Sequence, residues 1–298
     1  MFIESLKIRK DMKISELVDL FEKTAFNAKR LSIAAKIYEE MIKDNAFVFF
    51  TLAGAMIPAG MRNVISDMIK NDFIHCLVTT GANVVHEICE SLGFKHISGV
   101  PEVDDVELSK KGISRIYDVF IEQKAFEGLE EFISGILKEL NGTFGSYEFL
   151  QEVGKRINDK NSFLRVSYER GIPIFCPTLH DSIIGLHITI YSNIVIDYKR
   201  DISKLLDLCF QKKKFGIVII GGGVPKNFTL QSMLLAEGFD YAIQITTDLP
   251  EWGGLSGATL DEAKSWCKLK PNAKYMTVYC DATIALPLIY AYLLDKLK

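Results

Sequence analysis

A single stretch near the C-terminal end, WGGLSGATLDEAKSWCKLK at Trp252–Lys270, combines residue types that could perform covalent chemistry. A glycine-rich segment leads into a short predicted helix, and a carboxylate (Glu262), an indole (Trp266) and an amine (Lys268) follow within seven residues. A lysine acts as a nucleophile when burial or a neighbouring cation lowers its pKa, so that the amine is neutral. The stretch therefore indicates a site at which a lysine could bind its substrate covalently.

Each of these residues also has a structural explanation. Thr259–Glu262 fits the capping box, in which a threonine and a glutamate three residues later cap the start of a helix. Lys268 is a cation at a predicted helix end, and Pro271 behind it is a normal stop signal. Trp266 lies on the same helical face as Glu262, and it is either the apolar wall of an amine site or a core residue.

A second motif is Gly221–Gly223, which follows an apolar run. Glycines before a helix start let backbone amides approach a phosphate, although the segment does not match the dinucleotide motif G-x-G-x-x-G. A tight strand-to-helix turn explains it equally well. Asp281 could accept a hydrogen bond from a ribose hydroxyl or an adenine amine, or it could cap a helix. His86 and His180 follow apparent strands, where core or capping roles are as reasonable as ligand contacts.

Six apolar runs that are typical of buried strands alternate with helical patterns. They are Ala46–Leu52, Phe73–Val78, Ile172–Pro177, Phe215–Ile220, Tyr241–Ile245 and Tyr275–Cys280. The alternation predicts an α/β fold with a doubly wound, mostly parallel, Rossmann-like sheet and helices on both faces. Ligands bind such sheets at the carboxyl ends of the strands. Five of these ends carry Thr, Asp, Gly or Ala, which suits a polar, phosphate-bearing ligand.

The remaining patterns predict the domain organisation. Residues 14–44 predict one or two amphipathic helices, Pro58 is expected to open a helix that runs to about residue 72, and residues 83–92 predict another helix. Residues 93–170 interrupt the alternation without a convincing linker. We therefore expect a single domain over 1–298, with a helical N-terminal segment 1–45 and an insertion around 93–170.

Composition excludes several classes of function. The 298 residues carry a net charge of −3, whereas nucleic-acid surfaces are usually basic. No apolar run reaches the roughly 18–20 residues of a membrane span, and the N-terminus lacks the features of a secretory signal. The six cysteines form no CxxC pair and the five histidines do not cluster, so neither a disulfide framework nor a metal site is expected. A cytoplasmic protein with reduced thiols is the expectation.

Longer motifs occur in one order along the chain: TLAGAMIPAGMRNVI, LVTTGANVVHE, IPIFCPTLHDS, GGGVPKNF, GLSGATLDEAKSWCK and VYCDATIALPL. With these motifs the chain resembles the deoxyhypusine synthase family over nearly its whole length. The resemblance implies an NAD-dependent homotetramer with sites between subunits. It also implies a reaction in which spermidine is oxidised and its aminobutyl group is held as an imine on an enzyme lysine. The group then passes to a lysine of the translation factor 5A precursor.

The resemblance also implies roles for individual residues. Lys268 matches the family's catalytic lysine in the motif S-W-G-K, with Cys267 in place of the glycine. Glu262 and Trp266 match polyamine-binding residues, and the tryptophan face suits a cation. The glycines Gly253 and Gly254 are assigned to the same substrate site. The implied NAD contacts are Thr79, Thr80, Gly81, Asp181, Gly222, Gly223, Thr247, Asp281 and Ala282.

The sequence departs from the family pattern at several positions. Asn227 replaces a histidine that is implicated in proton handling, and an asparagine does not titrate near neutral pH. Trp252, Leu255 and Leu186 stand where the family has aspartates that flank the amine. Two alternatives therefore accompany the leading interpretation. One is a homospermidine-synthase-like transfer to a small amine such as putrescine, and the other is a non-catalytic protein that binds NAD or a polyamine.

Overall fold

The computed structural model describes residues 2–211 and 213–298 and divides into two compact units. Unit 1 comprises residues up to 53, residues 71–78 and residues from 202 onwards, and unit 2 comprises residues 54–70 and 79–201. The predicted insertion, 93–170, lies within unit 2. That the whole chain acts as one domain stays a prediction.

Unit 1 is built on parallel strands, which confirms the predicted α/β class. The strands are β1 (Phe47–Leu52), β2 (Cys76–Thr79, whose last residue belongs to unit 2), β9 (Phe215–Ile220), β10 (Phe239–Thr246) and β11 (Leu269–Tyr279). Their order is β11-β10-β9-β1-β2, and β9 pairs in parallel with both β1 and β10. Every residue of β9 is buried, as expected for a strand covered on both faces. The apolar runs thus predicted these strands correctly, with shifts at their ends.

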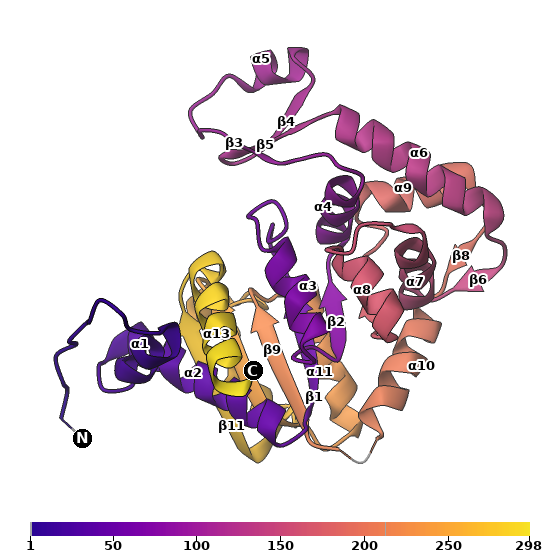
Figure 1. Ribbon diagram of the computed structural model, residues 1–298. Coiled ribbons are helices and arrows are strands. Elements are labelled where there is room, and N and C mark those ends of the chain that lie inside the picture. The colour runs from indigo at the N-terminus through magenta and orange to yellow at the C-terminus, as the bar shows by residue number, and fades with distance from the viewer. Residues whose placement is uncertain (1, 212) are drawn as a thin grey trace. The chain divides into compact units, whose positions relative to one another are not determined.

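Helices cover this sheet (Figure 1). The helical elements of unit 1 are α1 (Ile14–Phe21), α2 (Phe26–Lys43), the later part of α10 (Tyr198–Cys209), α11 (Gly223–Ser232), η1 (Met233–Leu235), η2 (Pro250–Trp252), α12 (Leu260–Ser265) and α13 (Ala282–Leu297). Helices α2 and α13 pack on each other and on β10, while α11 packs on β1. The buried hydroxyl of Tyr38 on α2 donates to the carbonyl of Phe73 at 2.7 Å, which ties the helix to the sheet.

Unit 2 is mainly helical. Its helices are α3 (Arg62–Lys70), α4 (Gly81–Ser91), α5 (Asp105–Lys110), α6 (Lys124–Glu139), α7 (Ser146–Arg156), α8 (Phe163–Arg170) and α9 (Ile183–Tyr191). Its strands are β3 (Ile97–Ser98), β4 (Ile113–Ile116), β5 (Val119–Glu122), β6 (Thr143–Phe144), β7 (Ile174–Phe175) and β8 (Val195–Ile196). The first three strands form a small antiparallel sheet.

The predicted helix start at Pro58 is wrong. Residues 56–60 form a turn, and α3 begins at Arg62. Gly60 adopts a φ of +83°, which glycine tolerates and a helix does not contain. Pro58 therefore belongs to the turn before the helix.

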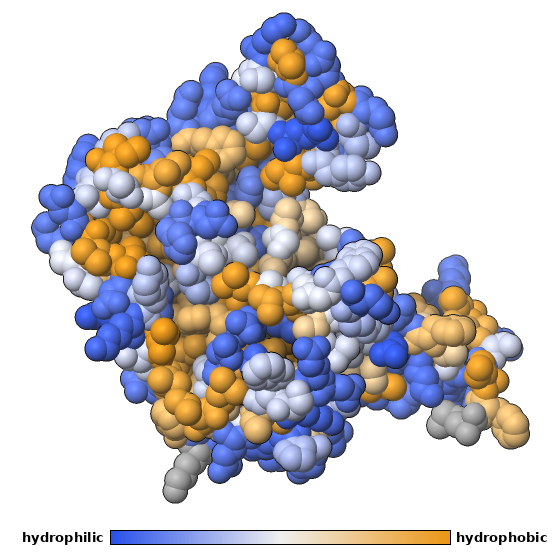
Figure 2. Space-filling view, turned by 180° about the vertical axis from the view of Figure 1, so that it is seen from behind, coloured by the Kyte–Doolittle hydropathy of each residue, from blue (hydrophilic) through white to orange (hydrophobic). Residues whose placement is uncertain are grey.

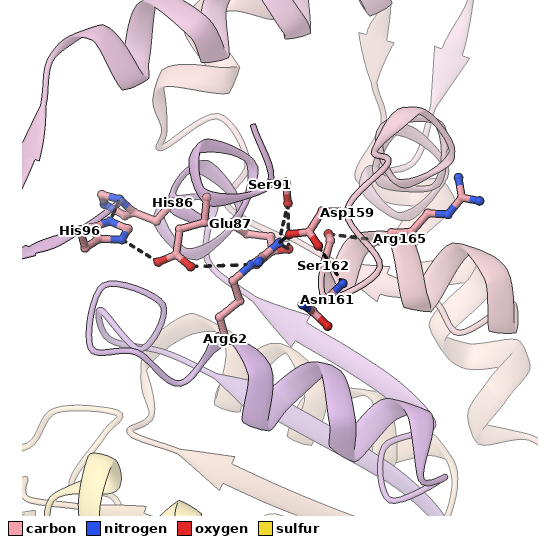
Figure 3. Close-up of polar contacts among 10 residues, drawn as sticks. Arg62, His86, Glu87, Ser91, His96, Asp159, Asn161, Ser162 and Arg165 are labelled. Atoms are coloured by element: carbon pink, nitrogen blue, oxygen red, sulfur yellow. Dashed lines mark hydrogen bonds and ion pairs between the residues drawn. The ribbon is translucent and has the colours of Figure 1, made fainter. Parts of the chain in front are cut away.

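Buried charges connect α3 to the rest of unit 2 (Figure 3). The Arg62 guanidinium donates to Glu87 on α4 at 2.8 Å, to Ser91 at 2.8 Å and to Asp159 at 2.6 Å. Arg62 and Glu87 are both buried. Burial raises the pKa of Glu87 to about 7, against the opposing effect of Arg62. The arginine is therefore needed to stabilise a carboxylate that has little contact with water.

Replacing Arg62 is expected to destabilise the fold. Arg62→Met leaves Glu87 and Asp159 without their cation, and breaking a buried ion pair in this way costs about 3–5 kcal/mol. Urea unfolding followed by circular dichroism measures the loss. The control is Lys70→Met on the same helix, which removes an exposed pair with Asp67 and should cost less than about 1 kcal/mol. Equal losses for the two variants would contradict a special role of the buried cluster.

The C-terminal end of α12 determines the backbone conformation of Cys267 in the SWCK motif. The amide of Cys267 donates to the carbonyl of Lys264 at 2.9 Å, and the amide of Lys268 donates to the carbonyl of Ala263 at 3.0 Å. These two bonds form a Schellman motif, whose penultimate residue is left-handed and is usually glycine. Cys267 takes this position with a φ of +56°. The cysteine therefore adopts a conformation for which glycine is better suited.

Cys267→Gly is expected to stabilise the protein. A non-glycine residue in the left-handed region costs about 1–2 kcal/mol, and the greater freedom of glycine in the unfolded chain offsets part of this, so a gain of roughly 0.5–1 kcal/mol remains. Thermal unfolding should show a midpoint raised by about 1–4 °C. Cys267→Ala removes the thiol but keeps the strain, and it should not raise the midpoint. A lower midpoint for the glycine variant would show that the cysteine side chain itself stabilises the helix end.

Candidate functional site

One cavity of unit 1, about 300 Å³ in volume, brings together four of the six residues predicted to be catalytic or substrate-binding. It is formed by α11, by the loop that leads into α12, and by α12 and its C-terminal end. Its lining residues are Lys226, Asn227, Leu230, Gln231, Leu255, Ala258, Thr259, Glu262, Ala263, Trp266 and Lys268. The predicted catalytic pair, Asn227 and Lys268, and the predicted substrate residues, Glu262 and Trp266, thus share one site.

Lys268 is half-buried at the wall of this cavity. Its Nζ donates to Asn227 Oδ1 at 3.4 Å and lies 5.7 Å from the centre of the Trp266 ring. Burial lowers the pKa of Lys268, and the charge of Glu262 partly opposes this effect. A lowered pKa increases the fraction of neutral amine, which is the form that attacks a carbon centre.

Trp266 and Glu262 both present their side chains to the cavity. Trp266 is 61% exposed, so the alternative that it is a core residue is wrong. The backbone amide of Glu262 donates to Thr259 Oγ1 at 3.0 Å, which confirms Thr259 as the N-cap of α12. This cap uses the main chain of Glu262 and leaves its carboxylate at the cavity. In the described part of the chain the Glu262 side chain makes no return bond to the Thr259 amide, so only the threonine half of the predicted capping box is formed.

Sequence reasoning missed Lys226, which lines the same cavity and is only 3% exposed. Its Nζ donates to Gln244 Oε1 on β10 at 3.1 Å and to the carbonyl of Ala258 at 2.5 Å. Burial lowers the pKa of Lys226 to about 8, and the nearby Lys268 cation contributes to the lowering. The available signal was a lysine on the first turn of a helix that follows a buried strand and a glycine run.

The glycine run has a clear packing role. A Cβ on Gly222 would lie 2.3 Å from the Cα of Ser256, so no side chain fits there. The amide of Gly223 donates to Ser256 Oγ at 3.1 Å, and Gly221 and Gly223 both have positive φ. The tight-turn interpretation therefore accounts for the glycines. The phosphate-loop interpretation stays a prediction, supported by the start of α11 at Gly223.

Two further predicted NAD contacts, Thr247 and Asp281, follow strands that neighbour the glycine turn. Thr247 directly follows β10 and Asp281 follows β11, while Gly222 follows β9. Because β9, β10 and β11 are neighbouring parallel strands, their carboxyl ends share one edge of the sheet. Asp281 accepts from the amide of Thr283 at 2.7 Å, which confirms the helix-capping alternative, and Ala282 is the first residue of α13.

The other predicted NAD contacts belong to unit 2. Thr79 is the buried last residue of β2, and Thr80 is the N-cap of α4. A Cβ on Gly81 would lie 2.5 Å from the Cβ of Ser182, so this glycine allows a close approach of two segments. Asp181 is exposed just before α9.

The remaining candidates have ordinary surroundings. The Nδ1 atom of His86 lies 2.9 Å from Nε2 of His96 (Figure 3). Burial lowers the pKa of His86 to about 4. His180 is exposed. Gly253 ends η2 with a φ of +69°, and neither it nor Gly254 lines the Lys268 cavity.

Within residues 2–211 and 213–298, no group of histidine, cysteine and carboxylate side chains could hold a metal ion. All six cysteines are free thiols, and four of them are buried. No helix in the described part of the chain combines the length and apolar character that crossing a membrane requires.

Comparison with known proteins places this site in context. The family model described as deoxyhypusine synthase matches residues 16–293. The chain is 66% identical to the probable deoxyhypusine synthase 1 of Archaeoglobus fulgidus, with 99% of each chain covered. It is 45% identical to the probable deoxyhypusine synthase of Methanosarcina thermophila, over 99% of this chain and 95% of the relative.

Solved structures agree on the fold. The crystal structure of a candidate deoxyhypusine synthase from Entamoeba histolytica superimposes with a TM-score of 0.68 at 18% identity, and 98% of this chain and 97% of that chain are covered. The family model and the identity of the Archaeoglobus relative both extend over nearly the whole sequence. The chain therefore belongs to the deoxyhypusine synthase family.

Proposed function

We propose that this protein is an NAD-dependent aminoalkyl transferase that carries an aminobutyl group on Lys268. The donor is an amine of the polyamine class such as spermidine, and the acceptor is a lysine of the translation factor 5A precursor. The observation that carries the proposal is the half-buried Lys268, with its lowered pKa, facing a cavity that it shares with Glu262 and Trp266. Membership of the deoxyhypusine synthase family supports the same reaction.

The residues around Lys268 suit a cationic substrate. The Glu262 carboxylate attracts an ammonium group, and the exposed face of Trp266 offers a cation–π contact. Asn227 accepts a hydrogen bond from Lys268 and orients its amine, but it does not exchange protons near neutral pH. In this proposal Asn227 is a positioning residue, and the proton moves between the amine nitrogens of substrate and lysine.

The strand ends of unit 1 fit a dinucleotide. Gly221 and Gly222 precede α11, which starts at Gly223 at the carboxyl edge of parallel strands, and Thr247 and Asp281 lie at the same edge. Helix starts and such edges favour phosphates and ribose hydroxyls. We assign Gly222, Gly223, Thr247, Asp281 and Ala282 of unit 1 to NAD. For Thr79, Thr80, Gly81 and Asp181 of unit 2, an NAD contact is proposed only from the resemblance of their motifs to the family. When bound, NAD would accept a hydride from the donor amine and later return it.

Lys268 then performs the transfer. Its neutral Nζ adds to the carbon of the oxidised donor, the bond from that carbon to the leaving amine breaks, and the carbon stays on Lys268 as an imine. The acceptor amine adds to the same carbon and displaces Lys268, which regains its free amine. Gly253 and Gly254 do not line this cavity, so their assignment to the substrate site rests on the resemblance to the family alone.

The same chemistry with a small acceptor such as putrescine would give a homospermidine-type product. Product analysis by mass spectrometry, with and without a factor 5A protein, separates the two acceptors. We also propose a homotetramer, as in the family. The exposed Leu186 and Ile190, one helical turn apart on α9, support a contact between subunits. Light scattering on the purified protein tests the assembly.

Lys268→Arg is expected to abolish the imine. Arginine keeps the positive charge but is never neutral in a protein, so it cannot add to the donor carbon. With NAD and spermidine, borohydride should trap an adduct on Lys268 of the natural protein and none on the variant, while NAD binding is unchanged. Lys264→Arg, on α12 and outside the cavity lining, should keep the adduct. Transfer by Lys268→Arg at the natural rate would disprove the mechanism.

The pH dependence of Lys268 should respond to Glu262. Since only the neutral amine reacts, the rate of imine formation with a small uncharged aldehyde rises as pH increases through the lowered pKa of Lys268. Glu262→Gln removes the charge that raises this pKa, so the midpoint should move to lower pH. Borohydride trapping over a pH series measures it, and Asp261→Asn is the control. A midpoint that stays in place or moves upward would show that Glu262 does not act on Lys268.

A further inference from the structure

Lys226 is the only buried lysine in the described part of the chain. Hydrophilic residues occupy much of the face drawn in Figure 2, and a surface of this kind is the usual place for lysine. Lys226 instead lies on the first turn of α11, is 3% exposed and lines the cavity of Lys268. The transfer steps on Lys268 leave this second amine without a chemical role.

The hydrogen bonds of Lys226 match those of a neutral amine. Its Nζ donates to Gln244 Oε1 at 3.1 Å and to the carbonyl of Ala258 at 2.5 Å. An ammonium has three N–H donors, whereas a neutral amine has two donors and a lone pair. Within residues 2–211 and 213–298, these two oxygens satisfy both donors of the neutral form, and no carboxylate accepts from Nζ. The lone pair of the neutral amine is left to take up a proton.

Charged groups from several elements act on this amine. Burial is the largest effect and lowers the pKa of Lys226, the carboxylates of Glu262 on α12 and of Asp248 in the loop after β10 oppose it, and the Lys268 cation adds to it. The resulting pKa of Lys226 is about 8. A group with a pKa close to the working pH is well suited to accept a proton and to return it. Asn227, the next residue on α11, cannot do either.

The proposed reaction requires a group that holds one proton. A donor ammonium must lose a proton before a hydride can leave its carbon, and the carbon then becomes part of an iminium ion. When the hydride returns at the end of the transfer, the product amine takes a proton back. One proton is therefore set free in the first half of the reaction and needed again in the second.

We propose that Lys226 stores this proton and exchanges it through Lys268. This inference rests on the proposed function and adds a residue to it. Neutral Lys268 takes the proton of the bound donor ammonium and passes it across the shared cavity to the neutral amine of Lys226, which becomes an ammonium. The hydride then leaves the donor carbon for NAD, and Lys268, neutral again, adds to that carbon. After the hydride has returned, Lys226 gives its proton back through Lys268 to the product amine. Lys226 is thus a positioning residue for the proton.

Lys226→Arg tests this storage. Arginine keeps the positive charge and offers N–H donors to Gln244 and Ala258, but it is never neutral and cannot accept a proton. With NAD and spermidine, the absorbance of NADH in the first turnover should appear about a hundredfold more slowly than in the natural protein. In the natural protein this rate should rise as pH increases through about 8, and the rise should be absent from the variant. Lys264→Arg, on α12 and outside the cavity lining, should keep both the rate and the rise.

A titration without NAD or amine measures the same property of Lys226 directly. Carbon NMR of the natural protein with ¹³C-labelled lysines should show one side chain that titrates at a pH of about 8. The signal of this side chain should be missing from Lys226→Arg. Calorimetry should show that the variant binds spermidine as the natural protein does, because the variant keeps the charge and the donors.

Three results would overturn the inference. A natural rate in Lys226→Arg would show that only the charge of Lys226 matters. A rate lowered by the same factor at every pH, with the rise retained, would show a purely structural role. A natural protein in which the Lys226 signal does not titrate near this pH would contradict the inference even if the variant fails to fold. Failure of the proposed function looks different, because the natural protein itself then forms neither NADH nor a Lys268 adduct.

Discussion

The buried ammonium of Lys226 is the contact on which the rest of the site depends. Through Gln244 and the carbonyl of Ala258 it joins α11, strand β10 and the loop that precedes α12. The amide of Gln244 extends the same network to the carbonyls of Gly221 and Ser256, at 3.0 and 2.8 Å. A buried cation needs such oxygen partners, and the loop is held in addition by Ser256, whose hydroxyl accepts from the amide of Gly223. The glycine turn and the start of α12 are therefore fixed by the same side chains.

This network also explains the electrostatics of the two lysines. Lys226 and Lys268 line one cavity with a single carboxylate among the described lining residues, and burial lowers the pKa of both. Lys226 is held by neutral oxygens, which stabilise its charge less than a carboxylate would. Among the described residues, the hydrogen-bond acceptor of Lys268 is the amide oxygen of Asn227 at 3.4 Å, which is also uncharged. The arrangement favours loss of a proton from one of the two amines, and Lys268 is the one that is exposed enough to meet a substrate.

Much of the fold could be predicted because its strands are continuous apolar runs. Phe215–Ile220 agrees with β9 residue by residue. Local capping signals were also readable, as Thr259 and Asp281 show. The predicted helix start at Pro58 was wrong because proline is common both in loops and in the first turn of a helix. The burial of Lys226 could not be predicted, since its partners Gln244 and Ala258 lie 18 and 32 residues away and only the folded chain brings them together. The exposure of Trp266 was equally invisible, because a tryptophan at helical spacing is typical of a core.

The short helix α12 limits which mutations the sequence around Lys268 can accept. Thr259 fixes its first turn and the Schellman bonds fix its last, so the direction in which Lys268 projects is set by a helix of six residues. Insertion or deletion of a single residue would rotate everything beyond it by about 100° and carry the amine away from Asn227. The length of α12 is therefore as strict a requirement as the lysine itself. Divergence of relatives in this segment should proceed by substitution, with gaps confined to the loops on either side.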